Sequence, residues 1–154
     1  MRVESVRGNE VDGLDAALGG DAEGGGGLIA VVEDEAIVLV GYQMLFESWG
    51  YEVVAAGSAD EALEQLNHSS RAPDVIVADY RLKNGKTGVD AIRSIQAAFD
   101  AAIPGILVTG DTGADRLREA AASGLPILHK PVNGRQLQDL IARALAAASA
   151  RPAQ

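Results

Sequence analysis

The chain has 154 residues, of which 47% are hydrophobic and 23% charged, a composition typical of a globular protein. A net charge of -9 disfavours direct binding to nucleic acid or to an anionic membrane surface. The absence of cysteine excludes disulfides, cysteine-based zinc sites and thiol catalysis. The sequence has no apolar run of about 18 residues and no signal-peptide core, so we predict a cytoplasmic protein with neither a membrane nor a nucleic-acid partner.

Residues 1–27 are predicted to be a flexible leader or linker outside the fold. This segment has no sustained hydrophobic period, and it ends in the glycine run 24–27. Such a segment cannot bury enough apolar surface to offset the backbone entropy lost on ordering. At the other end, residues 149–154 are predicted to be a disordered tail. One domain, 28–148, remains.

Strand and helix patterns alternate through this domain. Short apolar runs predict strands over 28–32, 51–56, 74–79, 103–109 and 126–129. Apolar stripes with helical spacing predict helices over 36–49, 59–68, 87–99, 115–123 and from 133 onward. Ser58 and Glu61 have the spacing of a capping box, and Gly50 and Gly124 follow the ends of helices. The alternation predicts an α/β fold, namely a flavodoxin-like (βα)5 doubly wound parallel sheet in the order 2-1-3-4-5.

Polar side chains stand just beyond the ends of four of the predicted strands. Glu33 and Asp34 follow the first strand, Asp79 ends the third, Thr109 ends the fourth and Lys130 follows the fifth. Ligands of open α/β sheets bind beyond the carboxyl ends of the strands, so these groups are expected to converge. Two or three carboxylates suit Mg²⁺, a carboxylate can attack phosphorus, and a lysine can neutralise a transferring phosphoryl group. Each feature alone has a simpler explanation as a helix cap or a solvated loop, whereas their joint placement favours a site.

Four segments of the chain resemble the motifs of the response-regulator receiver domain. In order and at the right spacing they are Val31 to Glu35, Asp74 to Asp79, Leu107 to Gly110, and His129 to Pro131. The resemblance covers about residues 28–148. It implies that Asp79 is the phosphoacceptor, that Glu33 and Asp34 are metal-site acids, and that the backbone carbonyl of Arg81 is a further ligand of Mg²⁺.

The same resemblance implies a switch. Thr109 resembles the switch hydroxyl and Lys130 the lysine that contacts the phosphoryl group. Many receivers carry an aromatic residue three positions before this lysine, where this chain has Ile127, and Met-Pro where it has Leu82 and Lys83. The usual coupling between hydroxyl and aromatic ring is therefore in question, and Ile127 is the residue expected at the switch position.

The amino-acid sequences of several segments are most similar to those of receivers attached to hybrid sensor histidine kinases. These segments are 79–82, 87–92, 109–112 and 124–131. With no effector domain expected after residue 148, three outputs stay open, one of which is the transfer of phosphate to a histidine phosphotransfer protein. In the other two, the domain signals through protein contacts of its fourth helix, fifth strand and fifth helix, or it regulates a kinase in cis.

The resemblance also implies the partners, which are a sensor histidine kinase or a histidine phosphotransfer protein. It describes a signalling domain rather than an enzyme, with self-catalysed phosphotransfer and dephosphorylation at Asp79. The oligomeric state is left open, with a dimer through the fourth helix, fifth strand and fifth helix as one alternative.

Two alternatives from other classes use the same fold. A hydrolase with an aspartyl intermediate needs a second acid two residues after the nucleophile, and that position holds Arg81. A flavin-binding electron carrier needs a hydroxyl-rich phosphate loop after the first strand, where acidic residues 33–35 would repel phosphate. Both are disfavoured.

Overall fold

The computed structural model describes residues 26–110 and 113–150, with side chains at all of these except 114–116 and 148–150. Residues 1–25 and 151–154 lie outside the described part, so most of the expected leader and tail stays a prediction. The strands are β2 (Leu28–Val32), β3 (Glu52–Ala56), β4 (Val75–Asp79), β5 (Gly105–Thr109) and β6 (Ile127–His129). The helices are α2 (Ala36–Ser48), α3 (Ala59–Ser69), α4 (Gly88–Ala98), α5 (Ala114–Ala122) and α6 (Gly134–Ala150).

All strand pairs are parallel, in the order β3-β2-β4-β5-β6. In chain order this is 2-1-3-4-5, which confirms the predicted flavodoxin-like fold. β2 pairs with β3 on one side and with β4 on the other, so the direction of winding reverses between β2 and β4. The carboxyl ends of β2, β4 and β5 therefore lie next to one another at the point where such sheets bind ligands.

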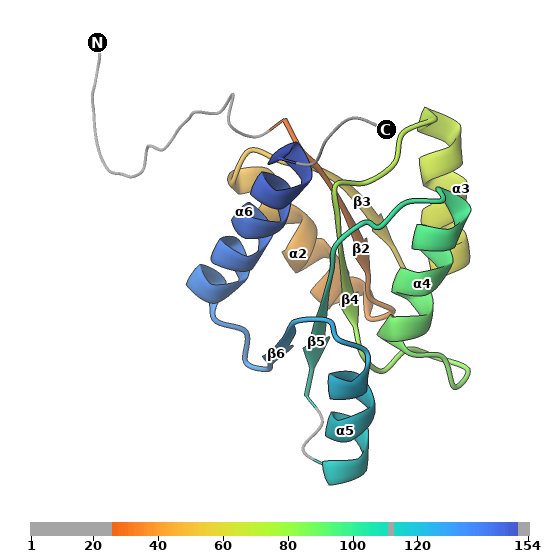
Figure 1. Cartoon of the computed structure of the whole chain (residues 1–154), viewed down its shortest axis with the longest axis vertical. Helices are drawn as coiled ribbons and strands as arrows, with labels where there is room; N and C mark the ends of the chain where they lie inside the picture. The colour runs from red at the N-terminus through yellow and green to blue at the C-terminus, as the bar shows by residue number, and fades with distance from the viewer. Residues whose placement is uncertain (1–25, 111–112, 151–154) are drawn as a thin grey trace.

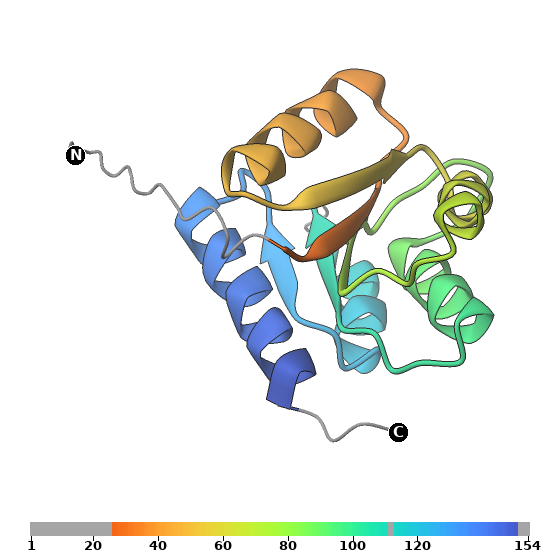
Figure 2. The same ribbon diagram turned by 90° about the horizontal axis from the view of Figure 1, so that it is seen from above.

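Helices cover both faces of the sheet (Figures 1 and 2), with α2 and α6 on one face and α3, α4 and α5 on the other. Successive residues of a strand pack alternately into two hydrophobic cores, one on each face of the sheet. On β4, Ile76 and Ala78 pack under α3 and α4, while Val75 and Val77 pack under α2 and α6. This burial on both faces is the reason that the strands read as continuous apolar runs. In the described part of the chain, no helix has the length and apolar character needed to cross a membrane.

Several boundaries differ from the predicted ones for local reasons. β5 begins at Gly105 rather than at residue 103, because Pro104 has no N–H to donate to the ladder and only its carbonyl oxygen is used, by the amide of Ile76 at 2.9 Å. Pairing already includes Gly27, whose carbonyl oxygen accepts from the amide of Glu52 at 3.0 Å. At the other end, α6 continues to Ala150, two residues past the expected boundary.

The helix caps follow the sequence with one difference. Ser58 Oγ accepts from the amide of Glu61 at 3.1 Å, but the Glu61 carboxylate accepts from the amide of Gly57 rather than of Ser58. The expected box is therefore only half formed. A complete capping box occurs at α4, where the side chains of Thr87 and Asp90 each accept from the other's backbone amide.

Candidate functional site

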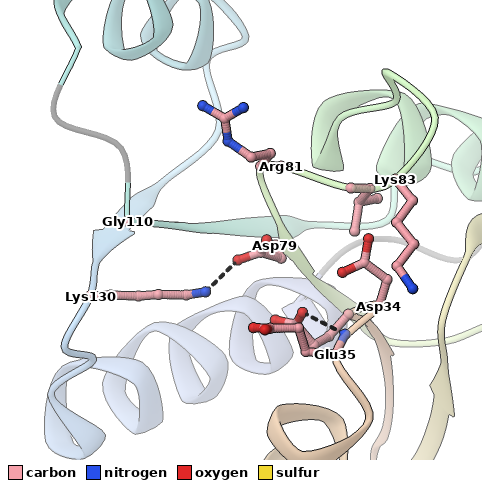
Figure 3. Close-up of a pocket in the computed structure, with 9 residues that line it drawn as sticks. Asp34, Glu35, Asp79, Arg81, Lys83, Gly110 and Lys130 are labelled. Atoms are coloured by element: carbon pink, nitrogen blue, oxygen red, sulfur yellow. Dashed lines mark hydrogen bonds and ion pairs between the residues drawn. The ribbon is translucent and has the colours of Figure 1, made fainter.

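A pocket of about 550 Å³ opens at the carboxyl edge of the sheet. Figure 3 shows it between the ends of β2, β4 and β5. Its lining combines the predicted acids and lysine with loop residues, namely Glu33, Asp34, Glu35, Asp79, Arg81, Leu82, Lys83, Gly110 and Lys130. Residues from four separate segments of the chain meet here because every strand of a parallel sheet ends at this edge.

Asp79 and Lys130 form the central contact of the pocket. Lys130 Nζ lies 2.9 Å from Asp79 Oδ1, and Figure 3 shows the ammonium directed at the carboxylate. Burial raises the pKa of Asp79, and the hydrogen bond and charge of Lys130 partly offset that rise. Burial lowers the pKa of Lys130, but contact with the Asp79 carboxylate outweighs it and leaves this pKa above its ordinary value. The pair is thus a buried carboxyl group held beside an ammonium group.

Glu33 is the most deeply buried acid of the site, at 1% exposed. Its Oε2 accepts from the backbone amide of Glu35 at 3.1 Å, while Oε1 has no hydrogen-bond partner among the described residues. Burial raises the pKa of Glu33 most, the Glu35 amide lowers it, and the charge of Asp79 raises it further. A buried carboxylate oxygen without a partner is costly, which points to a cation or an ordered water at this position.

Asp34 lines the same pocket and is half-buried. Its negative charge contributes to the raised pKa values of both Glu33 and Asp79, so the three acids influence one another electrostatically. In the described part of the chain, however, no three Asp, Glu, His or Cys side chains are close enough to form a ready metal cluster. The donor set still fits Mg²⁺, which takes one or two carboxylates and keeps several waters.

Of the other residues predicted for the site, Arg81 lines the pocket, whereas Thr109 and Ile127 are not among its lining residues. Thr109 ends β5 and is 2% exposed; its carbonyl oxygen accepts from the amide of Lys130 at 2.8 Å. Its side chain does not line the pocket, whereas the next residue, Gly110, does. The backbone of Arg81 donates to the Asp79 carboxylate, and Figure 3 shows its guanidinium pointing away from that carboxylate. Ile127 begins β6, half-buried against the core under α4.

Two further residues lie at the site without having been predicted there. Lys83 lines the pocket, and in Figure 3 its side chain runs along the same side as Asp34. The sequence feature that could have identified Lys83 as a site residue is its position in the loop, four residues after Asp79. Tyr42 of α2 is not among the lining residues, but it interacts electrostatically with Lys130, Glu33 and Asp79. Burial, together with the charges of Glu33 and Asp79, raises the pKa of Tyr42 to about 12, although the charge of Lys130 lowers it.

Comparison with known families identifies this arrangement. The family model described as the response regulator receiver domain matches residues 29–142, which includes all of the sheet except Leu28, together with the lining of the pocket. The chain belongs to the response regulator receiver domain family.

Proteins similar to this receiver domain include a transcriptional regulator and a solved receiver domain protein. The chain is 33% identical over 119 residues to the transcriptional regulatory protein ZraR of Escherichia coli O157:H7, covering 77% of this chain and 26% of ZraR. It therefore spans about a quarter of the length of that regulator. A receiver domain protein from Clostridium thermocellum superposes with a TM-score of 0.69 at 27% identity, over 80% of this chain and 97% of that one.

The receiver domain of a signal transduction histidine kinase from Syntrophus aciditrophicus superposes with a TM-score of 0.71. At 23% identity, over 84% of this chain and 97% of that chain, this likeness shows the fold alone. Receivers of both kinds, from transcriptional regulators and from a histidine kinase, are thus among the proteins that this receiver domain resembles.

Replacing Lys130 with Ala is expected to leave the receiver folded but less stable near pH 7. The Asp79 carboxylate loses the partner that lowers its pKa, and an acid with a raised folded pKa loses stability as pH rises through that pKa. We expect a loss of about 1 kcal/mol at pH 7, less than for a fully buried pair because the Lys130 side chain is 35% exposed. The difference should shrink near pH 4.

Urea unfolding at both pH values measures this effect, with Lys130→Arg as the control that keeps the charge. Beryllofluoride, which stands in for a phosphoryl group, should also move the amide signals of Thr109 and Ile127 less in Lys130→Ala than in the wild type. Equal responses in the two proteins would contradict the assigned role of Lys130.

Proposed function

We propose that Asp79 accepts a phosphoryl group from the phosphohistidine of a sensor histidine kinase or a histidine phosphotransfer protein. The observation that supports this most is the 2.9 Å contact between Lys130 Nζ and Asp79 Oδ1 in an open pocket. An ammonium so placed favours the ionised form of Asp79, against burial, which favours the protonated form and raises its pKa. It also stands ready to balance the charge that arrives with the phosphoryl group.

In the proposed step, a carboxylate oxygen of Asp79 attacks phosphorus as the bond from phosphorus to the histidine nitrogen breaks. The imidazole leaves and takes up a proton, and Asp79 becomes an acyl phosphate. Lys130 can then contact a phosphoryl oxygen in place of the carboxylate oxygen. Attack by water on the acyl phosphate would restore Asp79. No acid stands at position 81 to assist that attack, so we expect slow self-catalysed dephosphorylation rather than phosphatase chemistry.

Mg²⁺ is the proposed cofactor, as is general for receiver domains. Glu33, Asp34, Asp79 and the backbone carbonyl of Arg81 are the groups that would hold it. Two observations support this assignment: Oε1 of Glu33 has no hydrogen-bond partner within residues 26–110 and 113–150, and the charges of Asp34 and Asp79 raise the pKa of Glu33. When bound, the metal supplies positive charge that screens the approaching phosphoryl oxygens.

Intact mass after incubation with acetyl phosphate and Mg²⁺ tests the acceptor. The wild type should gain one phosphoryl group and Asp79→Asn none. Asp139→Asn, which removes an exposed carboxylate on α6, is the matched control and should be labelled like the wild type. Unchanged labelling of Asp79→Asn would refute the assignment of Asp79.

An exposed apolar stripe on α2 supports a protein donor. Ile37, Val40 and Met44 are 87%, 53% and 67% exposed, and their spacing puts them on one side of the helix. The stripe begins two residues after Glu35, which lines the pocket. A phosphohistidine that reaches Asp79 brings its own protein surface over this end of α2, and apolar side chains there would be buried on docking.

Replacing Ile37 with Glu is therefore expected to slow phosphotransfer from a phosphorylated histidine phosphotransfer protein by about tenfold, as loss of an interface residue does. Labelling by acetyl phosphate, which needs no protein surface, should not change. Ala142→Glu adds the same charge at an exposed position of α6 and serves as the control. Loss of labelling with both donors would mean that the substitution damages the pocket instead of a docking surface.

We propose that the phosphorylated domain signals to other proteins through contacts of α5, β6 and α6. We propose that this takes place in the cytoplasm. Regulation of a kinase in cis is the alternative, and a dimer through the same face stays a prediction. Asp139 and Arg143 of α6 line a shallow depression there beside Leu128 of β6, which gives a partner both charged and apolar groups to contact.

A further inference from the structure

The described side chains of helix α5 make few apolar contacts with the rest of the domain. Among its described side chains, at 117–122, Ala120 is buried and Leu117 is half-buried, whereas the others are exposed. Polar contacts are therefore important for its position. The hydroxyl of Tyr80 donates to Glu119 Oε1 at 2.7 Å, and Arg93 Nη2 donates to the carbonyl oxygen of Ser123 at 3.1 Å, just beyond the helix.

Tyr80 is at the same time part of the phosphorylation site's framework. It directly follows Asp79, its amide donates to the carbonyl oxygen of Val108 at 2.8 Å, and its carbonyl oxygen accepts from the amide of Gly88 at 2.8 Å. Its ring is 4% exposed and packs in the core under α4. One side chain thus runs from the residue after the acceptor to the middle of α5.

The residue at the usual aromatic switch position cannot make such a link. Ile127 has neither a ring that can change its rotamer nor a hydroxyl that can hydrogen-bond. Thr109 is nevertheless only five positions before Ala114, the first residue of α5, so a movement of Thr109 toward a phosphoryl group is close enough along the chain to displace this helix. The Tyr80–Glu119 hydrogen bond opposes such a displacement, because the ring of Tyr80 is fixed in the core.

We propose that this hydrogen bond is a latch that holds α5 in its unphosphorylated position, and that phosphorylation signals to α5 by releasing it. The inference rests on the proposed function of Asp79. A contact made in only one of two states biases the equilibrium toward that state. Removing the latch should therefore move α5 toward its phosphorylated position before any phosphoryl group arrives.

Nuclear magnetic resonance of the full chain, titrated with beryllofluoride and Mg²⁺, tests the latch. Tyr80→Phe keeps the buried ring and removes only the hydroxyl, and Glu119→Ala removes the acceptor from the exposed end. In both variants the free amide signals of 117–122 should lie part of the way toward the wild-type beryllofluoride positions. The apparent Kd for beryllofluoride should fall roughly threefold to tenfold, the range that corresponds to a single hydrogen bond.

Glu119→Gln is the matched control, because its amide oxygen can still accept from Tyr80, and its signals should lie close to those of the wild type. The double variant Tyr80→Phe with Glu119→Ala should shift no further than either single one, since both remove the same contact. If the wild type responds to beryllofluoride but neither single variant differs from it in α5 or in Kd, the latch is refuted and the phosphoacceptor assignment stands. If the wild type itself does not respond, both are overturned.

Discussion

Replacing Asp34 with Asn is expected to stabilise the receiver in EDTA while ending its response to Mg²⁺ and its phosphorylation. The charge of Asp34 adds to the raised pKa values of Glu33 and Asp79. Without metal, these acids ionise against one another in a partly desolvated pocket, and Asp34→Asn relieves that repulsion. We expect a gain of about 1 kcal/mol at pH 7, roughly the effect of a shift of one pKa unit.

The pH dependence of this gain follows from the direction of the shifts. A carboxyl whose folded pKa is raised contributes stability that is fully present below its unfolded pKa and is lost as pH rises through the folded one. The wild type should therefore lose stability between about pH 4 and pH 7 through Glu33 and Asp79, and Asp34→Asn should lose less. Near pH 3, below the raised pKa values of Glu33 and Asp79, the two proteins should differ little.

Urea unfolding in EDTA and in Mg²⁺ across this pH range measures both effects. Mg²⁺ binds the folded state, so it should stabilise the wild type but not the variant. Asp60→Asn, an exposed change in the first turn of α3, controls for the loss of one negative charge. A variant that is less stable than the wild type in EDTA at pH 7 would show that Asp34 has a structural role that outweighs the repulsion.

Replacing Gly88 with Ala is expected to destabilise the receiver by about 2 kcal/mol or more. A Cβ at this position would lie 2.4 Å from the carbonyl oxygen of Asp79 and 2.9 Å from Leu107 Cδ2. Neither atom can yield easily, because one belongs to the backbone of Asp79 and the other lies in the core. Overpacking of this kind typically costs about 1–3 kcal/mol, and it exceeds the gain in helix propensity from glycine to alanine.

Gly134→Ala provides a matched control, because Gly134 is likewise the first residue of its helix and an added Cβ there would meet nothing within 4 Å. That variant should be as stable as the wild type or up to about 1 kcal/mol more stable. Gly88→Ala should also accept phosphate from acetyl phosphate more slowly under conditions where it remains folded, since the clash displaces the backbone of Asp79. Equal stability of the two variants would show that the start of α4 moves aside without cost.

The sequence alone determined the sheet and the kinds of residue at its edge. Strands buried on both faces require continuous apolar runs, so Val75 to Ala78 could be predicted as a central strand without any tertiary information. The alternation with helices implied parallel strands, and parallel strands bring their carboxyl ends to one edge. For that reason Asp79, Asp34 and Lys130 could be expected to meet before their distances were known.

Only the tertiary structure decided how these groups are paired. Residue types do not reveal that Lys130 contacts Asp79 at 2.9 Å, or that one oxygen of Glu33 is buried without a partner among the described residues. Nor could they show that Thr109 lies outside the pocket lining, or that the hydroxyl of Tyr80 reaches Glu119 across 39 positions of the chain. Hydrophobic periodicity reports which face of an element is buried. The partner of a polar side chain depends on distances between elements, which exist only once the elements have packed.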